Sequence, residues 1–162
     1  MRILGIDPGL QKCGWGIIES EGHALKFIAC GHIATNVGDD MARRLAEIHE
    51  GILKIIKTYE PDSAAIEETF VNRNPASALK LGQARGVAMA VPALCGLSVS
   101  EYSANTIKKS IVGAGHAAKV QMGMMVKVLL PACGTPTADE ADALAVAITH
   151  AHYASLPLAA RM

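Results

Sequence analysis

The chain has 162 residues, of which 51% are hydrophobic and 19% charged, and its formal net charge is zero. This length predicts one domain with its own core, and the composition is typical of a soluble globular protein, not a disordered one. The longest apolar runs fall short of the ~20 residues that cross a bilayer, and Arg2 precedes a strand pattern in place of a signal peptide. We therefore expect a cytoplasmic protein with a single domain over residues 1–155 and a C-terminal tail over 156–162.

The distribution of charge along the chain is more informative than its sum. A net charge of zero argues against a nucleic-acid partner. However, residues 1–72 contain seven Lys or Arg and eleven Asp or Glu, whereas residues 73–130 contain seven basic residues and Glu101 alone, a local net charge of +6. This basic middle fits either a surface for a polyanion or a set of solvated helix faces, and the charge pattern leaves both open.

The cysteines are widely spaced and show neither a CxxC pair nor a His at ligand spacing. We predict buried reduced thiols, not a zinc site or a disulfide framework. The four positions are Cys13, Cys30, Cys95 and Cys133.

The N-terminal part predicts three consecutive strands with short links, which is typical of an antiparallel meander. The first is an apolar run that ends at Asp7, where Pro8-Gly9 forces a turn because proline lacks the N–H that a central strand needs. Residues 13–19 and 23–34 predict the next two strands. Glycines 14 and 16 weaken the second strand, so we expect them to admit a close neighbour, either a backbone or a ligand near Asp7.

A helix and a fourth strand follow. Asp39-Asp40 precede a helical apolar pattern that should end near Tyr59, because Pro61 disfavours helix in the residue before it. Residues 63–66 then form an apolar run into Glu67-Glu68, so a carboxylate again lies at the end of a buried strand.

The next helix has a clear start. Asn74-Pro75 predicts an N-cap followed by proline in the first turn of a helix over 76–91, and Pro92 should kink or end it. Gly82 and Gly86 are four apart and would let another backbone approach. That spacing suits either packing on the sheet or a two-fold helix contact between subunits.

The second half of the chain predicts a short strand over 97–102 and a helix over 105–112. A flexible link over 113–119, which ends at Lys119, then leads to a second helix over 120–130. Thr137-Ala-Asp-Glu140 has the S/T-x-x-E pattern of a capping box and opens a last helix that runs to about His152.

Four acids occur on otherwise apolar segments. Asp7 and Glu67 end strands, Asp139 and Asp142 share a face of the last helix, and Glu140 points elsewhere and can serve as the cap. Gathering four carboxylates without compensation is unfavourable, so such a cluster implies bound cations, and hard oxygen ligands suit Mg²⁺ or Mn²⁺. Two such ions about 4 Å apart stabilise an in-line phosphoryl displacement. Each acid alone fits a surface or capping role, and only their joint placement favours a nuclease.

The chain resembles the RuvC family of Holliday-junction resolvases, within the RNase H-like nuclease superfamily, along most of its length. The resemblance lies in Gly5-Ile-Asp-Pro-Gly9, Ile66-Glu-Glu-Thr-Phe70, Ser77-Ala-Leu-Lys-Leu-Gly-Gln-Ala-Arg-Gly86, Val112-Gly-Ala-Gly115 with Lys119, and Ala138-Asp-Glu-Ala-Asp-Ala-Leu-Ala145. The third motif is highly specific. The first is shared with sugar kinases and related ATPases, which need a second lobe that this chain is too short to supply.

This resemblance implies an α/β RNase H-like fold, with a mixed five-stranded sheet whose first three strands are antiparallel, flanked by helices. It implies a homodimer that makes paired nicks in a four-way DNA junction, and a branch-migration helicase complex of the RuvA and RuvB type as a partner. It also implies hydrolysis with two Mg²⁺ ions per site, with Mn²⁺ as a substitute, giving 5′-phosphate and 3′-hydroxyl ends.

By the same resemblance, Asp7, Glu67, Asp139 and Asp142 are the catalytic, metal-binding acids. Strand alternation lets only one of Glu67 and Glu68 point into the site, and the family pattern selects Glu67.

The resemblance also nominates DNA contacts. Lys108 and Lys119 match basic positions of the family. Phe70 would stack on a base opened at the junction, or else fill the core. The candidate contacts to the DNA backbone, which could instead be solvated or salt-bridged, are Arg73, Lys80 and Arg85.

Two other functions stay open at this point. One is a catalytically silent junction-binding module whose acids serve only packing and capping. The other is a small phosphotransferase of the actin-like ATPase kind, which the chain length disfavours.

Overall fold

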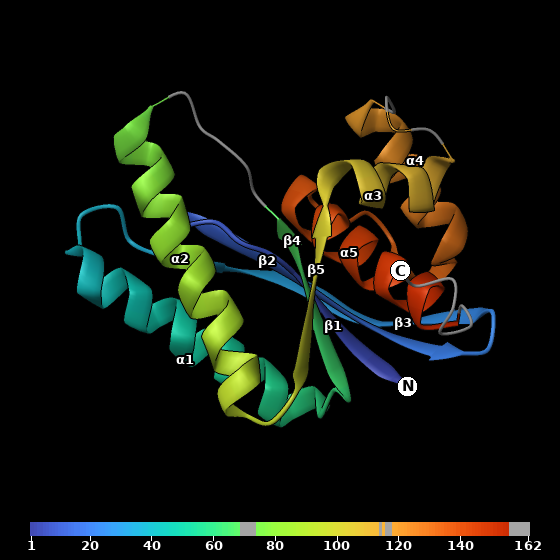
Figure 1. The fold of residues 1–162 in the computed structure, drawn as a ribbon, viewed down its shortest axis with the longest axis horizontal. Coiled ribbons are helices and arrows are strands. Elements are labelled where there is room, and N and C mark those ends of the chain that lie inside the picture. Colours follow the sequence, from blue (N-terminus) through green and yellow to red (C-terminus); the bar gives the residue numbers. More distant parts are fainter. Residues whose placement is uncertain (69–73, 114, 116–117, 156–162) are drawn as a thin grey trace.

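The structure is a computed structural model that describes residues 1–68, 74–113, 115 and 118–155. Its strands form one sheet in the order β3-β2-β1-β4-β5 (Figure 1). Their bounds are Arg2–Asp7 for β1, Lys12–Glu21 for β2, Ala24–Ala34 for β3, Ser63–Glu68 for β4 and Ser98–Ser103 for β5. The first three strands pair antiparallel, and β1, β4 and β5 pair parallel. The predicted mixed sheet is confirmed.

Helices cover both faces of the sheet. Helices α1 and α2 lie on one face and α3, α4 and α5 on the other (Figure 1). Their bounds are Met41–Tyr59 for α1, Pro75–Leu94 for α2, Ala104–Val112 for α3, Lys119–Leu129 for α4 and Ala138–Ser155 for α5, with a 3₁₀ turn over Pro131–Cys133. Within the described residues, none of these helices combines the length and apolar character that crossing a lipid bilayer requires.

Alternation along the central strand divides the core into two layers. Leu4 and Ile6 pack with α1 and α2, whereas Ile3 points to the opposite face and packs with α5. All three side chains are buried, which stabilises the fold by about 1.5–3 kcal/mol each. The odd positions of β1 therefore face α5, and Asp7 is one of them.

Glycines bring α5 unusually close to the sheet. A Cβ added at Gly5 would lie 2.1 Å from the Ala143 carbonyl oxygen, and one at Gly16 would lie 2.6 Å from a methyl group of Leu144. No side chain fits at either of these two positions. The expectation that the glycines of the second strand admit a close neighbour is confirmed, with the Asp139 backbone at Gly14 and Leu144 at Gly16.

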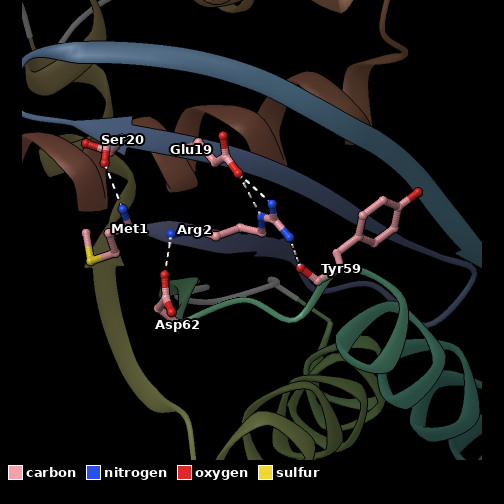
Figure 2. A network of polar contacts seen from close by, with 6 residues as sticks. All are labelled: Met1, Arg2, Glu19, Ser20, Tyr59 and Asp62. Carbon is pink, nitrogen blue, oxygen red and sulfur yellow. Dashed lines mark hydrogen bonds and ion pairs between the residues drawn. The ribbon is translucent and has the colours of Figure 1, made fainter.

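The opposite end of β1 is fixed by a polar network (Figure 2). The Arg2 guanidinium donates to the Glu19 carboxylate on β2 and, over 2.6 Å, to the Tyr59 carbonyl at the end of α1. The Arg2 N–H donates to Asp62 before β4, and the Met1 ammonium donates to the Ser20 carbonyl. The hydrogen bond from Arg2 lowers the pKa of Glu19. These contacts hold the register of β1 against both neighbours.

The predicted helix starts are confirmed. The Asp40 side chain accepts from the Arg43 N–H at the start of α1, and the Asn74 side chain accepts from the Ala76 N–H at the start of α2. Thr137 and Glu140 form the capping box of α5, with the Thr137 N–H donating to Glu140 Oε2 over 2.8 Å and the Glu140 N–H donating to Thr137 Oγ1 over 3.4 Å.

The prediction that the helix ends at Pro92 is wrong, because α2 continues through it to Leu94. Proline removes one N–H from the helix, but only two residues follow it, so little of the hydrogen-bond ladder is lost. The Cys95 and Leu97 N–H groups both donate to the Pro92 carbonyl and close the helix end.

Two further expectations need correction. Lys119 is the first residue of α4 and not the end of a flexible link. The cysteines are reduced, but only Cys13 and Cys133 are buried, while Cys30 is half-buried and Cys95 exposed.

Other element boundaries differ from prediction by one to three residues, because helix and strand ends depend on caps and pairing that periodicity does not specify.

Candidate active site

The sheet register brings two acids together. Ile6 of β1 pairs in parallel with Ile66 of β4, so the next residues, Asp7 and Glu67, lie side by side at the carboxyl ends of adjacent strands. Both belong to the face covered by α5, because Gly5 and Ala65, two residues earlier in each strand, also face it.

The first turn of α5 lies directly over the neighbouring strand. Gly14 of β2 pairs with Asp7, and a Cβ added at Gly14 would lie 2.2 Å from the Asp139 carbonyl oxygen. This close approach places Asp139 and Asp142, three residues apart on the helix, beside the two strand-end acids.

All four acids line one hollow of about 490 Å³. Two lysines and an apolar wall complete it: Lys108, Lys119, Ala104, Ile107, Met122 and Ala145. The predicted acids are therefore brought together with the two predicted lysines.

Three helices begin at this hollow. Ala104 is the first residue of α3, Lys119 the first of α4, and Asp139 lies in the first turn of α5. Helix N-termini carry a partial positive charge and free N–H groups, which favour an anion nearby. The hollow therefore combines carboxylates with an electropositive frame suited to a phosphate.

Asp7 is the most perturbed of the acids. Burial and, after it, the charges of Asp142, Glu67 and Asp139 raise the pKa of Asp7 to about 8, and the charge of Lys119 opposes this shift. Because burial and three neighbouring carboxylates disfavour the ionised form of Asp7, this carboxyl group gains most from a bound cation.

The pKa values of two other acids, Glu67 and Asp142, are also raised. Burial raises the pKa of Glu67, with Asp142 adding to the effect and Lys119 and Lys108 opposing it. Burial also raises the pKa of Asp142, while Lys119 lowers it. The Lys119 ammonium lies 3.6 Å from Asp142 Oδ2, so this lysine partly neutralises the acids.

The donor set fits a hard divalent cation, because four carboxylates in one hollow offer only oxygen ligands. As the side chains lie, however, no three His, Cys, Asp or Glu of the described residues are close enough to hold a metal ion. Ligation therefore requires rotation of the carboxylates toward a common point.

Glu67 and Glu68 line different hollows. Glu67 lies with the other acids, whereas Glu68 lines a larger hollow of about 820 Å³ beside β5, together with Ser100, Tyr102 and His150. Among the residues that the structure describes, no lysine or arginine lines the larger hollow. Acids and lysines meet in the smaller hollow.

The remaining predicted DNA contacts lie elsewhere or outside the described residues. Lys80 is exposed on α2. Arg85 is half-buried, forms an ion pair with Glu101, and donates from Nε to the Glu67 carbonyl over 3.3 Å. Phe70 and Arg73 lie outside the described residues.

Sequence reasoning missed the apolar wall of the hollow and the contact between His32 and Glu140. Ile107 and Met122 come from helices whose packing the sequence does not specify. His32 of β3 lies 3.6 Å from Glu140, next to Asp139, and only the strand register reveals that pairing.

An open mixed sheet with acids at the ends of β1 and β4 and on the helix above them is the arrangement of an RNase H-like nuclease. The particular family follows from comparison with known proteins. The family model described as "Crossover junction endodeoxyribonuclease RuvC" matches residues 3–150. This chain belongs to that family.

Similar proteins agree with this assignment. A curated crossover junction endodeoxyribonuclease RuvC of Rhodopseudomonas palustris (strain BisA53) is 58% identical over 153 residues, covering 94% of this chain and 88% of the relative. The structure of Thermus thermophilus RuvC has a TM-score of 0.86 at 32% identity and covers 95% of both chains. The T. thermophilus protein in complex with a Holliday junction substrate has a TM-score of 0.89 at 31% identity, covering 96% of this chain and 95% of that one.

Proposed function

We propose that this protein is a metal-dependent endonuclease that resolves four-way DNA junctions by symmetric nicks. The observation that carries the proposal is the hollow in which half-buried Asp7 meets three further acids beside two lysines. Family membership supports the nuclease activity, and the junction-bound relative supports the substrate class.

Asp7, Glu67, Asp139 and Asp142 are the residues that would hold the metal. Mg²⁺ at these oxygens, or Mn²⁺ in its place, supplies an activated water and charge stabilisation for in-line displacement at phosphorus, which leaves 5′-phosphate and 3′-hydroxyl ends. Asp7 lies between Glu67 of β4 and the helix acids above β2, so it would be the acid common to both sets of metal ligands.

The chain's own groups orient the DNA. Lys108 and Lys119 line the hollow beside the acids and can pair with phosphate oxygens on either side of the scissile bond. The N-termini of α3, α4 and α5 add a field that favours a phosphate over a neutral group. Ile107 and Met122 form an apolar wall that limits water on one side of the hollow. Phe70, Arg73, Lys80 and Arg85 stay proposals as DNA contacts.

The open face of α2 supports a homodimer. Nothing lies within 4 Å of a Cβ added at Gly82 or Gly86, so no described residue of the chain packs against these glycines. Leu79, three residues before Gly82, is 66% exposed. The alternative that these glycines pack on the sheet is wrong, and a second copy of α2 fits this face. Analytical ultracentrifugation should show a dimer that Leu79→Glu dissociates.

A helicase complex of the RuvA and RuvB type as partner, and a cytoplasmic location, remain proposals that rest on the family.

Cleavage of synthetic DNA tests the function. A labelled four-way junction and a linear duplex of the same sequence should be incubated with and without Mg²⁺. We expect paired nicks in the junction only, and only with the metal. Equal cutting of the duplex would contradict junction selectivity. Asp7→Asn should abolish cutting but keep junction binding, and undiminished cutting by that variant would overturn the site. Binding without cutting by the unaltered protein would instead support the silent-module alternative.

A further inference from the structure

The sheet register places three side-chain positions in one row beneath the first turn of α5. Gly14 of β2 pairs with Asp7 of β1 on one side and with His32 of β3 on the other. Directly paired residues share a face of the sheet, and at Gly14 that face carries the Asp139 backbone. The helix turn therefore rests on a glycine between an acid and a histidine.

Consecutive residues of this turn reach in opposite directions along the row. Asp139 lines the hollow that contains Asp7. Glu140 instead reaches β3, where its Oε1 lies 3.6 Å from Nδ1 of His32. The Glu140 carboxylate also contacts the Cys30 thiol, whose pKa burial and Glu140 together raise to about 11.

Both oxygens of the Glu140 carboxylate make contacts. Oε2 accepts the Thr137 N–H over 2.8 Å as part of the capping box, while Oε1 faces His32. A capping residue needs only the first contact. The contacts with β3 join the helix turn to the strand farthest from Glu67, since β3 is the edge of the sheet on that side.

We propose that Glu140 is a positioning residue that sets how far Asp139 and Asp142 lie from Asp7. Gly14 has no side chain to stop the turn from sliding across the sheet, and the contact of Glu140 with β3 would supply that limit. His32 and Cys30 form the anchor on β3. This inference rests on the proposed function of the four acids as metal ligands, because only then does their spacing matter for activity.

The test separates anchoring from capping with two variants of one capping box. Glu140→Ala removes one half of the cap together with the anchor, whereas Thr137→Ala removes the other half of the cap and leaves Glu140 facing His32. His32→Ala removes the anchor alone. His32→Asn should keep the anchor, because the amide nitrogen of asparagine lies close to the position of Nδ1 in histidine.

Mn²⁺ affinity, measured by calorimetry on the full chain, is the first readout, and kcat and KM for junction cleavage are the second. We expect Glu140→Ala and His32→Ala to weaken Mn²⁺ binding at least fivefold and to lower kcat at least tenfold with KM within twofold. Thr137→Ala and His32→Asn should stay within twofold of the unaltered protein in both.

Equal Mn²⁺ affinity in Glu140→Ala and Thr137→Ala would overturn the proposal, because Glu140 would then act as a cap only. If Glu140→Ala does not fold, His32→Ala is compared with His32→Asn instead. Unchanged Mn²⁺ affinity in His32→Ala then overturns the proposal. Failure of the proposed function would look different: the unaltered protein would bind Mn²⁺ without cutting the junction.

Discussion

Gly14 carries the backbone of Asp139, whose carbonyl oxygen would lie 2.2 Å from any Cβ at that position. This contact joins β2 to the first turn of α5 and sets the height of Asp139 and Asp142 above the sheet. Because Gly14 is also the strand partner of Asp7, the absence of a side chain there lets the helix acids approach the strand acid.

Gly14→Ala should therefore abolish cleavage and destabilise the fold by about 3 kcal/mol or more, since the clash is with backbone and not with a flexible side chain. Thermal unfolding and a junction-cleavage assay check this. Gly123→Ala in α4 is the matched control, because nothing lies within 4 Å of its added Cβ. That change should stabilise the protein by roughly 0.5–1 kcal/mol. Full activity in Gly14→Ala would contradict the close packing of α5.

Asp7→Asn should stabilise the metal-free protein while it abolishes cutting. The pKa of Asp7 is about 8 in the folded protein and 3.8 as its ordinary value, so between these pH values the folded state retains a proton that the unfolded chain has lost. The contribution of Asp7 to stability is therefore full below pH 4 and is lost as pH rises to 8.

Melting curves in EDTA measure this effect. The Tm of Asp7→Asn should exceed that of the unaltered protein by a difference that grows with pH and reaches roughly 5 °C or more at pH 8. Saturating Mn²⁺ should raise the Tm of the unaltered protein more than that of the variant, because ligand binding to the folded state stabilises it. A pH-independent difference would contradict the raised pKa.

Glu67 and Glu68 offer a matched pair of carboxylates one residue apart. Glu67→Gln should reduce cleavage at least 100-fold, because Glu67 lies with the other acids, whereas Glu68→Gln should stay within threefold because Glu68 faces another hollow. Single-turnover cleavage of a labelled junction measures both. Comparable losses in the two variants would show that the assignment of Glu67 is wrong.

Lys119→Met should separate metal binding from cleavage. The ammonium lies 3.6 Å from Asp142 and competes with a cation for the acids, so Mn²⁺ affinity should rise two- to threefold in the variant. Cleavage should fall at least tenfold, because a phosphate loses its partner. Stability should change by less than about 0.5 kcal/mol, since the lysine side chain is 84% exposed and such pairs contribute little.

Lys127→Met, which changes an exposed residue of the same helix, is the control and should alter neither Mn²⁺ affinity nor cleavage. Weaker Mn²⁺ binding in Lys119→Met would show that Lys119 supports the cation and does not compete with it.

The sequence determined the local features and the chemistry of the site. Apolar runs, caps and turns predict the strands that end at Asp7 and Glu67 and the capped helix that carries Asp139 and Asp142. These are properties of residues near one another in the chain, governed by periodicity and by backbone hydrogen bonds. The acidic residues themselves could be selected because they interrupt segments that are otherwise apolar.

Tertiary structure alone decided how these pieces meet. The register Ile6 with Ile66 sets Asp7 beside Glu67, and the absence of a side chain at Gly14 lets α5 descend onto β2. Pairing across β1, β2 and β3 also brings His32 to Glu140, more than 100 residues away in the chain. Contacts between distant residues depend on which strands pair and how closely layers pack, and no local pattern specifies either.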